Sequence, residues 1–79
     1  MRIDKYLKVS RIIKRRTVAN EVCDAGKVTV NGKVVRASYD VKVDDVIEID
    51  FVAKAIIVKV VSVQETVRKE DASSLYTSV

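Results

Sequence analysis

The chain of 79 residues is long enough for one domain with a small hydrophobic core. It has no histidine, so it lacks the commonest general base. Its single cysteine, Cys23, can form neither an internal disulfide nor a cysteine-based zinc site. Its apolar runs are far shorter than the ~20 residues that span a membrane, and the charged N-terminus is not followed by the apolar stretch of a signal peptide. We therefore expect a cytoplasmic protein without a cofactor.

Positive charge is concentrated at the N-terminal end. The first sixteen residues contain seven basic residues and one acidic residue, whereas the remainder contains eight basic and ten acidic residues. The formal net charge of +4 therefore understates the basicity of this segment. A localised excess of this kind is typical of a surface that meets a phosphate backbone.

The N-terminal segment is predicted to form a helix over residues 3–10. Asp4 precedes Lys8 by four positions, which is the favourable order for an exposed ion pair. The positions that recur at helical spacing on the other face are Ile3, Tyr6, Leu7 and Ser10.

A second helix is expected after the basic connection, within which Ile13 offers an apolar anchor. Thr17 is placed as its N-cap, and Gly26 as the left-handed residue that ends it. The stripe expected to be buried consists of Val18, Ala19, Val22 and Cys23.

The rest of the chain is predicted to be mainly strand. Asn31-Gly32 between two β-prone runs, 28–30 and 33–35, is the strongest short hairpin signal. Residues 46–52 and 55–63 predict two further strands with a turn at Ala53-Lys54, and residues 64–79 predict a short helix or a loose tail. The expected organisation is a domain over 1–63 followed by 64–79. The expected fold class is α+β, with two N-terminal helices packed on a small curved antiparallel sheet.

Catalytic chemistry finds little support in the sequence. The chain has no glycine-rich phosphate loop, and Cys23 on the apolar face of a helix is expected to be a small core residue. The adjacent carboxylates of Asp44 and Asp45 lie between two strands and are interpreted as a solvated turn, not as a site. We therefore expect a binding protein and no enzyme.

The basic segment favours binding to the phosphate backbone of a nucleic acid. Lys14-Arg15-Arg16 directly precedes a helix start, where free backbone N–H groups and the helix dipole add to the positive potential. The four aromatic side chains are scattered, so there is no platform on which single-stranded bases could stack. Two short helices that present Arg and Lys to a backbone suit the recognition of a folded duplex or junction by its shape.

Three segments of the sequence, in this order, resemble the alpha-L RNA-binding motif of ribosomal protein S-four. They are Arg2-Ile3-Asp4-Lys5-Tyr6-Leu7, Lys14-Arg15-Arg16-Thr17-Val18-Ala19 and Gly26-Lys27-Val28-Thr29-Val30-Asn31-Gly32-Lys33. The resemblance covers about residues 1–52. It is closer to the stand-alone RqcP group, which is related to the heat-shock protein of fifteen kilodaltons. One departure is Val43-Asp44-Asp45, where family members often have a glycine turn.

The resemblance implies a factor that binds the large ribosomal subunit, through ribosomal RNA and peptidyl-tRNA, and assists ribosome-associated quality control of stalled nascent chains. It implies a tailing factor as partner and a monomer off the ribosome. Asp4 would orient neighbouring basic side chains. The RNA-binding residues, carried over by position, would be Arg2, Lys5, Lys8, Arg11, Lys14, Arg15, Arg16, Thr17, Asn31 and Lys33.

Two alternatives stay open at this point. The same motif is often fused to RNA-modifying enzymes, so a free-standing copy could be the targeting subunit of such an enzyme. The chain could also be a protein-interaction module that recruits a partner through an exposed β edge, in which case it would have no salt-dependent affinity for RNA.

Overall fold

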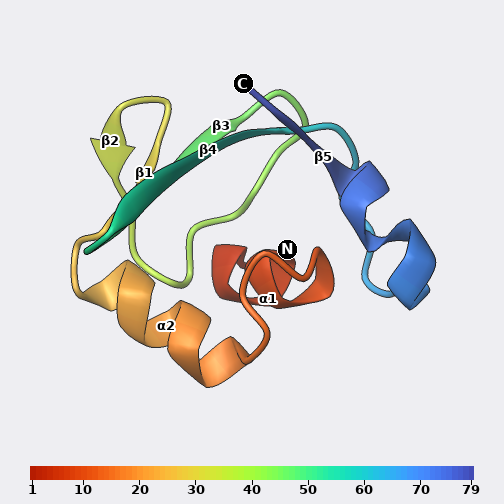
Figure 1. Ribbon diagram of the computed structural model, residues 1–79, viewed down its shortest axis with the longest axis horizontal. Helices are drawn as coiled ribbons and strands as arrows, with labels where there is room; N and C mark the ends of the chain where they lie inside the picture. The colour runs from red at the N-terminus through yellow and green to blue at the C-terminus, as the bar shows by residue number, and fades with distance from the viewer.

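The computed structural model describes residues 1–79 as two short α-helices, a five-stranded antiparallel sheet and one 3-10 helix (Figure 1). Both α-helices lie on the same side of the sheet, whose strand order is β2-β1-β3-β4-β5 (Figure 1). This arrangement confirms the expected α+β class. The elements are α1 (Ile3–Val9), α2 (Arg16–Asp24), β1 (Val28–Val30), β2 (Lys33–Val34), β3 (Val46–Phe51), β4 (Lys54–Val60), η1 (Lys69–Leu75) and β5 (Tyr76–Ser78).

The hydrophobic core lies between the helices and the sheet. Ile13 in the basic connection is buried, as expected. The predicted stripe of α2 is only partly correct, because Ala19 and Cys23 are buried whereas Val18 is 40% exposed. The largest fully buried aliphatic and aromatic side chains come from α1, β1, β3, β4 and the end of η1: Ile3, Tyr6, Leu7, Val28, Ile47, Ile49, Val58, Val60 and Leu75. The remaining faces of α1 and α2 are therefore free to carry charge.

Helix α2 begins two residues earlier than predicted. Its N-cap is Arg15, in an extended conformation without a side-chain cap, and Thr17 lies in the first turn. Because Arg15, Arg16 and Thr17 are all exposed, solvent can satisfy the free N–H groups at this end, and no hydroxyl is needed there. The predicted end is confirmed, since Gly26 follows the helix with φ +79°.

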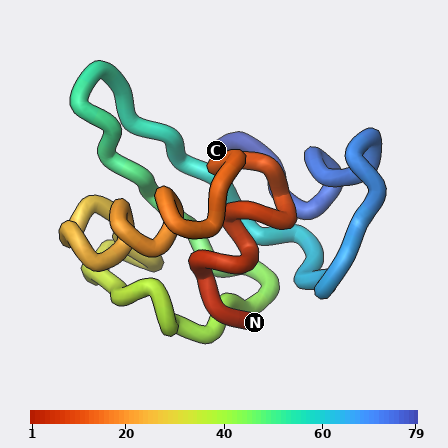
Figure 2. Tube along the Cα trace, turned by 90° about the horizontal axis from the view of Figure 1, so that it is seen from below, coloured from red at the N-terminus to blue at the C-terminus, as the bar shows by residue number.

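The two predicted hairpins are both present. Asn31 and Gly32 have φ of 53° and 86°, the left-handed values that a tight turn between β1 and β2 requires. In the second hairpin Phe51 pairs with Lys54, so the turn is Val52-Ala53 and the predicted Ala53-Lys54 is wrong by one residue. This hairpin projects from the body of the protein (Figure 2), and Val52 at its tip is 97% exposed.

The segment after Gln64 contains a strand that was not predicted. The expected short helix is η1, and β5 then pairs with β4, with Val60 opposite Tyr76. Leu75 is fully buried, and its carbonyl accepts a hydrogen bond of 2.7 Å from the hydroxyl of Tyr6. The division of the chain into 1–63 and 64–79 stays a prediction.

The interpretation of Asp44 and Asp45 as a solvated turn is wrong for Asp45, which is buried. Its carboxylate accepts hydrogen bonds from the Tyr39 hydroxyl at 2.9 Å, the Asn31 amide at 3.1 Å and the Lys42 backbone N–H at 3.0 Å. Asp44 is exposed and has φ 76°, a left-handed value that glycine adopts more readily than other residues. Asp45 therefore joins three segments of the fold.

Candidate RNA-binding surface

The carboxylate of Asp4 is the centre of a polar network between α1 and α2. Its side chain is only 3% exposed. Arg2 donates to it through Nε and a terminal nitrogen, both at 3.2 Å. The Lys5 backbone N–H at 2.7 Å, the Asn20 amide at 3.2 Å and an Arg16 guanidinium nitrogen at 3.5 Å also donate. The expected pair between Asp4 and Lys8 is therefore not formed.

This network holds two guanidinium groups at the surface. Burial alone would raise the pKa of Asp4, but hydrogen bonds from Asn20 and Arg2, together with the charge of Arg16, lower it below its ordinary value. Asp4 is thus ionised at neutral pH. The Arg2 and Arg16 side chains are 50% and 48% exposed, so each keeps donors that face solvent. The hydrogen bonds from Arg2 and Arg16 to Asp4 agree with the hypothesis that Asp4 orients neighbouring basic side chains.

A shallow hollow of about 470 Å³ lies over the network. Three of the predicted RNA-binding residues line it, namely Arg2, Arg16 and Thr17, and Asn20 and Glu21 complete its wall. Sequence reasoning missed Asn20. The only signal for it is its place one helical turn after Arg16, which puts the two side chains on the same face of α2.

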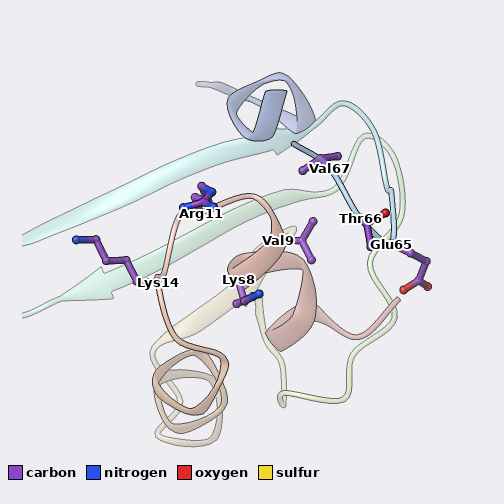
Figure 3. Close-up of a pocket in the computed structure, with 7 residues that line it drawn as sticks. All are labelled: Lys8, Val9, Arg11, Lys14, Glu65, Thr66 and Val67. Atoms are coloured by element: carbon purple, nitrogen blue, oxygen red, sulfur yellow. The ribbon is translucent and has the colours of Figure 1, made fainter. Parts of the chain in front are cut away.

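A second group of predicted residues surrounds a separate hollow of about 350 Å³ (Figure 3). Lys8, Arg11 and Lys14 line it from the side of α1 and the loop that follows, and Glu65 lies on the opposite wall. Lys5 forms an ion pair with Glu65, which lowers the pKa of that carboxyl through a hydrogen bond and charge attraction. Glu65 was not predicted, because nothing local in the sequence links it to a residue sixty positions earlier.

The remaining predicted residues lie apart from these two hollows. Arg15 is exposed at the start of α2. Asn31 and Lys33 belong to the β1–β2 hairpin, on the sheet and away from α1 (Figure 1). The Asn31 side chain bonds to Asp45 and to the backbone N–H of Val46, so its contacts are structural. A role for Asn31 and Lys33 in RNA binding stays a prediction.

The structure offers little for catalysis. Cys23 is buried as expected, and burial, followed by the charges of Asp4 and Asp24, raises the pKa of its thiol to about 11. The thiol is therefore neutral at physiological pH and poorly nucleophilic. No group of three or more Cys, Asp or Glu side chains is placed to hold a metal ion.

No helix has the length and apolar character needed to cross a membrane.

Sequence comparisons support the resemblance. Residues 1–47 match the S4 domain. The chain is 55% identical over 76 residues to the RQC P-site tRNA stabilizing factor of Streptococcus pneumoniae, with 96% of this chain and 86% of that protein covered. It is 57% identical, with the same shares covered, to the factor of that name from Halalkalibacterium halodurans. It is 48% identical to the Bacillus subtilis factor, with 98% and 90% covered.

Two solved structures share the fold. The trimeric structure of Vibrio cholerae Heat Shock Protein 15 matches with a TM-score of 0.92 and 25% identity, over 100% of this chain and 81% of that one. The solution structure of a hypothetical protein matches with a TM-score of 0.84 and 28% identity, over 100% and 96%. The predicted relation to the heat-shock protein of fifteen kilodaltons is thereby confirmed.

Proposed function

We propose that this chain, which belongs to the family of S4-domain RQC P-site tRNA stabilizing factors, binds ribosomal RNA and peptidyl-tRNA on the large ribosomal subunit. In this proposal it assists ribosome-associated quality control of stalled nascent chains, together with a factor that tails them. It acts in the cytoplasm, is a monomer off the ribosome and carries out no chemical step of its own.

The observation that carries the proposal is the pair of guanidinium groups held by Asp4. Arg2 is the residue that precedes α1 and Arg16 is the first residue of α2, and the buried carboxylate fixes both of them. A guanidinium group whose orientation is already fixed loses little conformational entropy when its remaining N–H groups donate hydrogen bonds to phosphate oxygens. Such contacts position a protein on RNA without reading its sequence, which suits a factor that recognises a folded shape.

The mechanism that follows is stabilisation by binding. A protein that binds one arrangement of RNA and tRNA more tightly than the others shifts the population toward that arrangement. The helical side of the molecule supplies the contacts, and the sheet is the scaffold that holds α1 and α2 in register. The partner factor would then meet the tRNA already held in the required arrangement.

The salt dependence of RNA binding tests the charged surface. If about five phosphates are contacted, log affinity for a structured RNA falls against log salt with a slope of roughly −3.5 to −4.5. Arg16→Ala removes one contact and makes the slope less steep by roughly 0.7 to 0.9. The matched control is Arg36→Ala, because Arg36 is exposed but lies outside both hollows. An affinity that does not respond to salt, or equal slopes for both variants, would contradict the proposal.

Sedimentation of a tagged protein in cell lysate tests the ribosomal assignment. We expect the protein to migrate with large ribosomal subunits, and an Arg15→Glu, Arg16→Glu double variant to remain at the top of the gradient. Migration of the wild-type protein with an RNA-modifying enzyme would instead support a targeting subunit. Migration with another protein, without salt-dependent RNA affinity, would support an interaction module.

A further inference from the structure

Three basic residues around the hollow near Glu65 have no acidic partner. Among the bases of the N-terminal segment, Arg2 and Arg16 pair with Asp4, and Lys5 pairs with Glu65. The bases without a salt bridge are Lys8, Arg11, Lys14 and Arg15, and the first three line this hollow. Since the one carboxylate in its wall is already paired with Lys5, the hollow has a clear excess of positive charge.

The hollow also has an apolar side. Val9 from the end of α1 and Val67 from the segment before η1 both line it, and both side chains pack partly against the core (Figure 3). The hydroxyl-bearing Thr66 is exposed beside them. The hollow has a volume of about 350 Å³, at the lower end of the range for small-ligand pockets. It can therefore hold more than a phosphate group.

The backbone at Arg11 is a second, independent feature of this wall. Arg11 follows the C-cap of α1 with φ 62°, in the left-handed region where glycine is the usual residue. An arginine costs more free energy there than glycine would. Asp44 has the same backbone conformation without a basic hollow beside it, so the strain at Arg11 supports a site only together with the hollow that Arg11 lines.

We propose that this hollow is a subsite for one unpaired nucleotide of the bound RNA. The phosphate of that nucleotide meets Lys8, Arg11 and Lys14, and its base lies against Val9 and Val67. The proposal rests on the proposed function, because the nucleotide belongs to the RNA that Arg2 and Arg16 hold. The two hollows share no lining residue, so paired and unpaired parts of one RNA can be bound at separate places.

Two RNA stems test the subsite, one fully paired and the other identical except for a single bulged nucleotide. We expect the wild-type protein to bind the bulged stem about tenfold more tightly, which is the effect of roughly one charge-assisted hydrogen bond. The Arg11→Gly variant should fold, because glycine adopts the left-handed conformation without strain. It lacks the guanidinium group and should therefore lose the preference for the bulged stem. Asp44→Gly is the matched control, since Asp44 is also an exposed, charged residue at positive φ and its side chain lies outside the hollow. It should keep the full preference.

A second pair of measurements separates the base from the phosphate. A bulge that lacks its base keeps the phosphate contacts but loses the contact with Val9 and Val67, so it should bind the wild-type protein more weakly than the intact bulge. Thr66→Glu adds a carboxylate at the exposed rim and should also abolish the preference for the bulged stem.

Equal affinity of the wild-type protein for the paired and bulged stems would overturn the subsite, while tight, salt-dependent binding of both would leave the proposed function intact. An abasic bulge that binds as well as the intact one, or full preference in Arg11→Gly, would also overturn it. Failure of the wild-type protein to bind either stem would refute the proposed function itself.

Discussion

Replacing Asp4 by asparagine tests how much the buried carboxylate contributes. The substitution removes the charge that Arg2 and Arg16 face and turns an amide donor toward other donors. Hydrogen bonds to a charged group contribute about 1.5–3 kcal/mol each. Both guanidinium groups are half exposed, so in the variant they can form hydrogen bonds with water instead. These bonds replace most of the stabilisation that the two arginines gain from Asp4. We expect a loss of about 2 kcal/mol, mainly from the bonds of Lys5 and Asn20.

Urea denaturation and thermal melting measure this loss. For a domain of this size a change of 2 kcal/mol lowers Tm by roughly 8–16 °C. The control is Asp50→Asn, because Asp50 is an exposed acid on β3 and should leave Tm nearly unchanged. An Asp4→Asn protein as stable as this control would refute the reasoning, since it would mean that the carboxylate gains nothing from its five donors.

The effect on RNA binding shows whether Asp4 acts through the arginines. Without Asp4, two long side chains must be ordered on binding, at about 0.5–1.5 kcal/mol each, so we expect affinity to fall roughly tenfold. In a double-mutant cycle with Arg16→Ala, the combined loss should be smaller than the sum of the single losses. Additive losses would indicate that Asp4 only stabilises the fold.

The same variant predicts a pH dependence. The pKa of Asp4 is lower in the folded protein than its ordinary value of 3.8. The unfolded state therefore binds the proton more readily, and the stabilisation is fully present above pH 3.8 and is lost as the pH falls through the folded pKa. The difference in free energy of unfolding between wild type and Asp4→Asn should be constant at pH 6–8 and should shrink in acid. A difference that grows in acid would contradict this assignment.

Two further predictions concern buried groups. Tyr6→Phe removes the hydroxyl that donates to the Leu75 carbonyl and should cost about 1–2 kcal/mol in urea denaturation; an unchanged free energy of unfolding would mean that the bond contributes nothing. Cys23, with its thiol buried and its pKa raised to about 11, should react with iodoacetamide slowly in native protein and quickly in urea; equal rates would show that the thiol is accessible in the folded state.

Features set by a residue and its immediate neighbours were predictable from the sequence. Asn31, Gly32 and Gly26 adopt left-handed conformations that asparagine and glycine tolerate better than other residues, so the hairpin and the end of α2 appear where expected. A boundary that depends on weaker preferences was less certain. The turn at Val52 and Ala53 has no glycine, and only the register of the ladder between β3 and β4 decides it.

The parts of the site that were missed depend on contacts between distant segments. Asp45 reads locally as a solvated acid, and only the arrival of Tyr39 and Asn31 explains its burial. In the same way, the sequence order of Asp4 favours a neighbour on its own helix, whereas its actual partners include Asn20 from α2. The basic residues were predictable as a set, but their division between two hollows was not, because it depends on where residues 65–67 pass.

The bond between Tyr6 and Leu75 has a consequence for how the protein is made. These residues are 69 positions apart, and closing so long a loop is an entropic cost that folding meets only when both ends are present. During synthesis, α1 leaves the ribosome long before β5 exists to pair with β4. The basic helix that is proposed to hold RNA thus gains its last supporting contacts only after residues 75–78 emerge. The binding surface is therefore completed at a late stage of the protein's own translation.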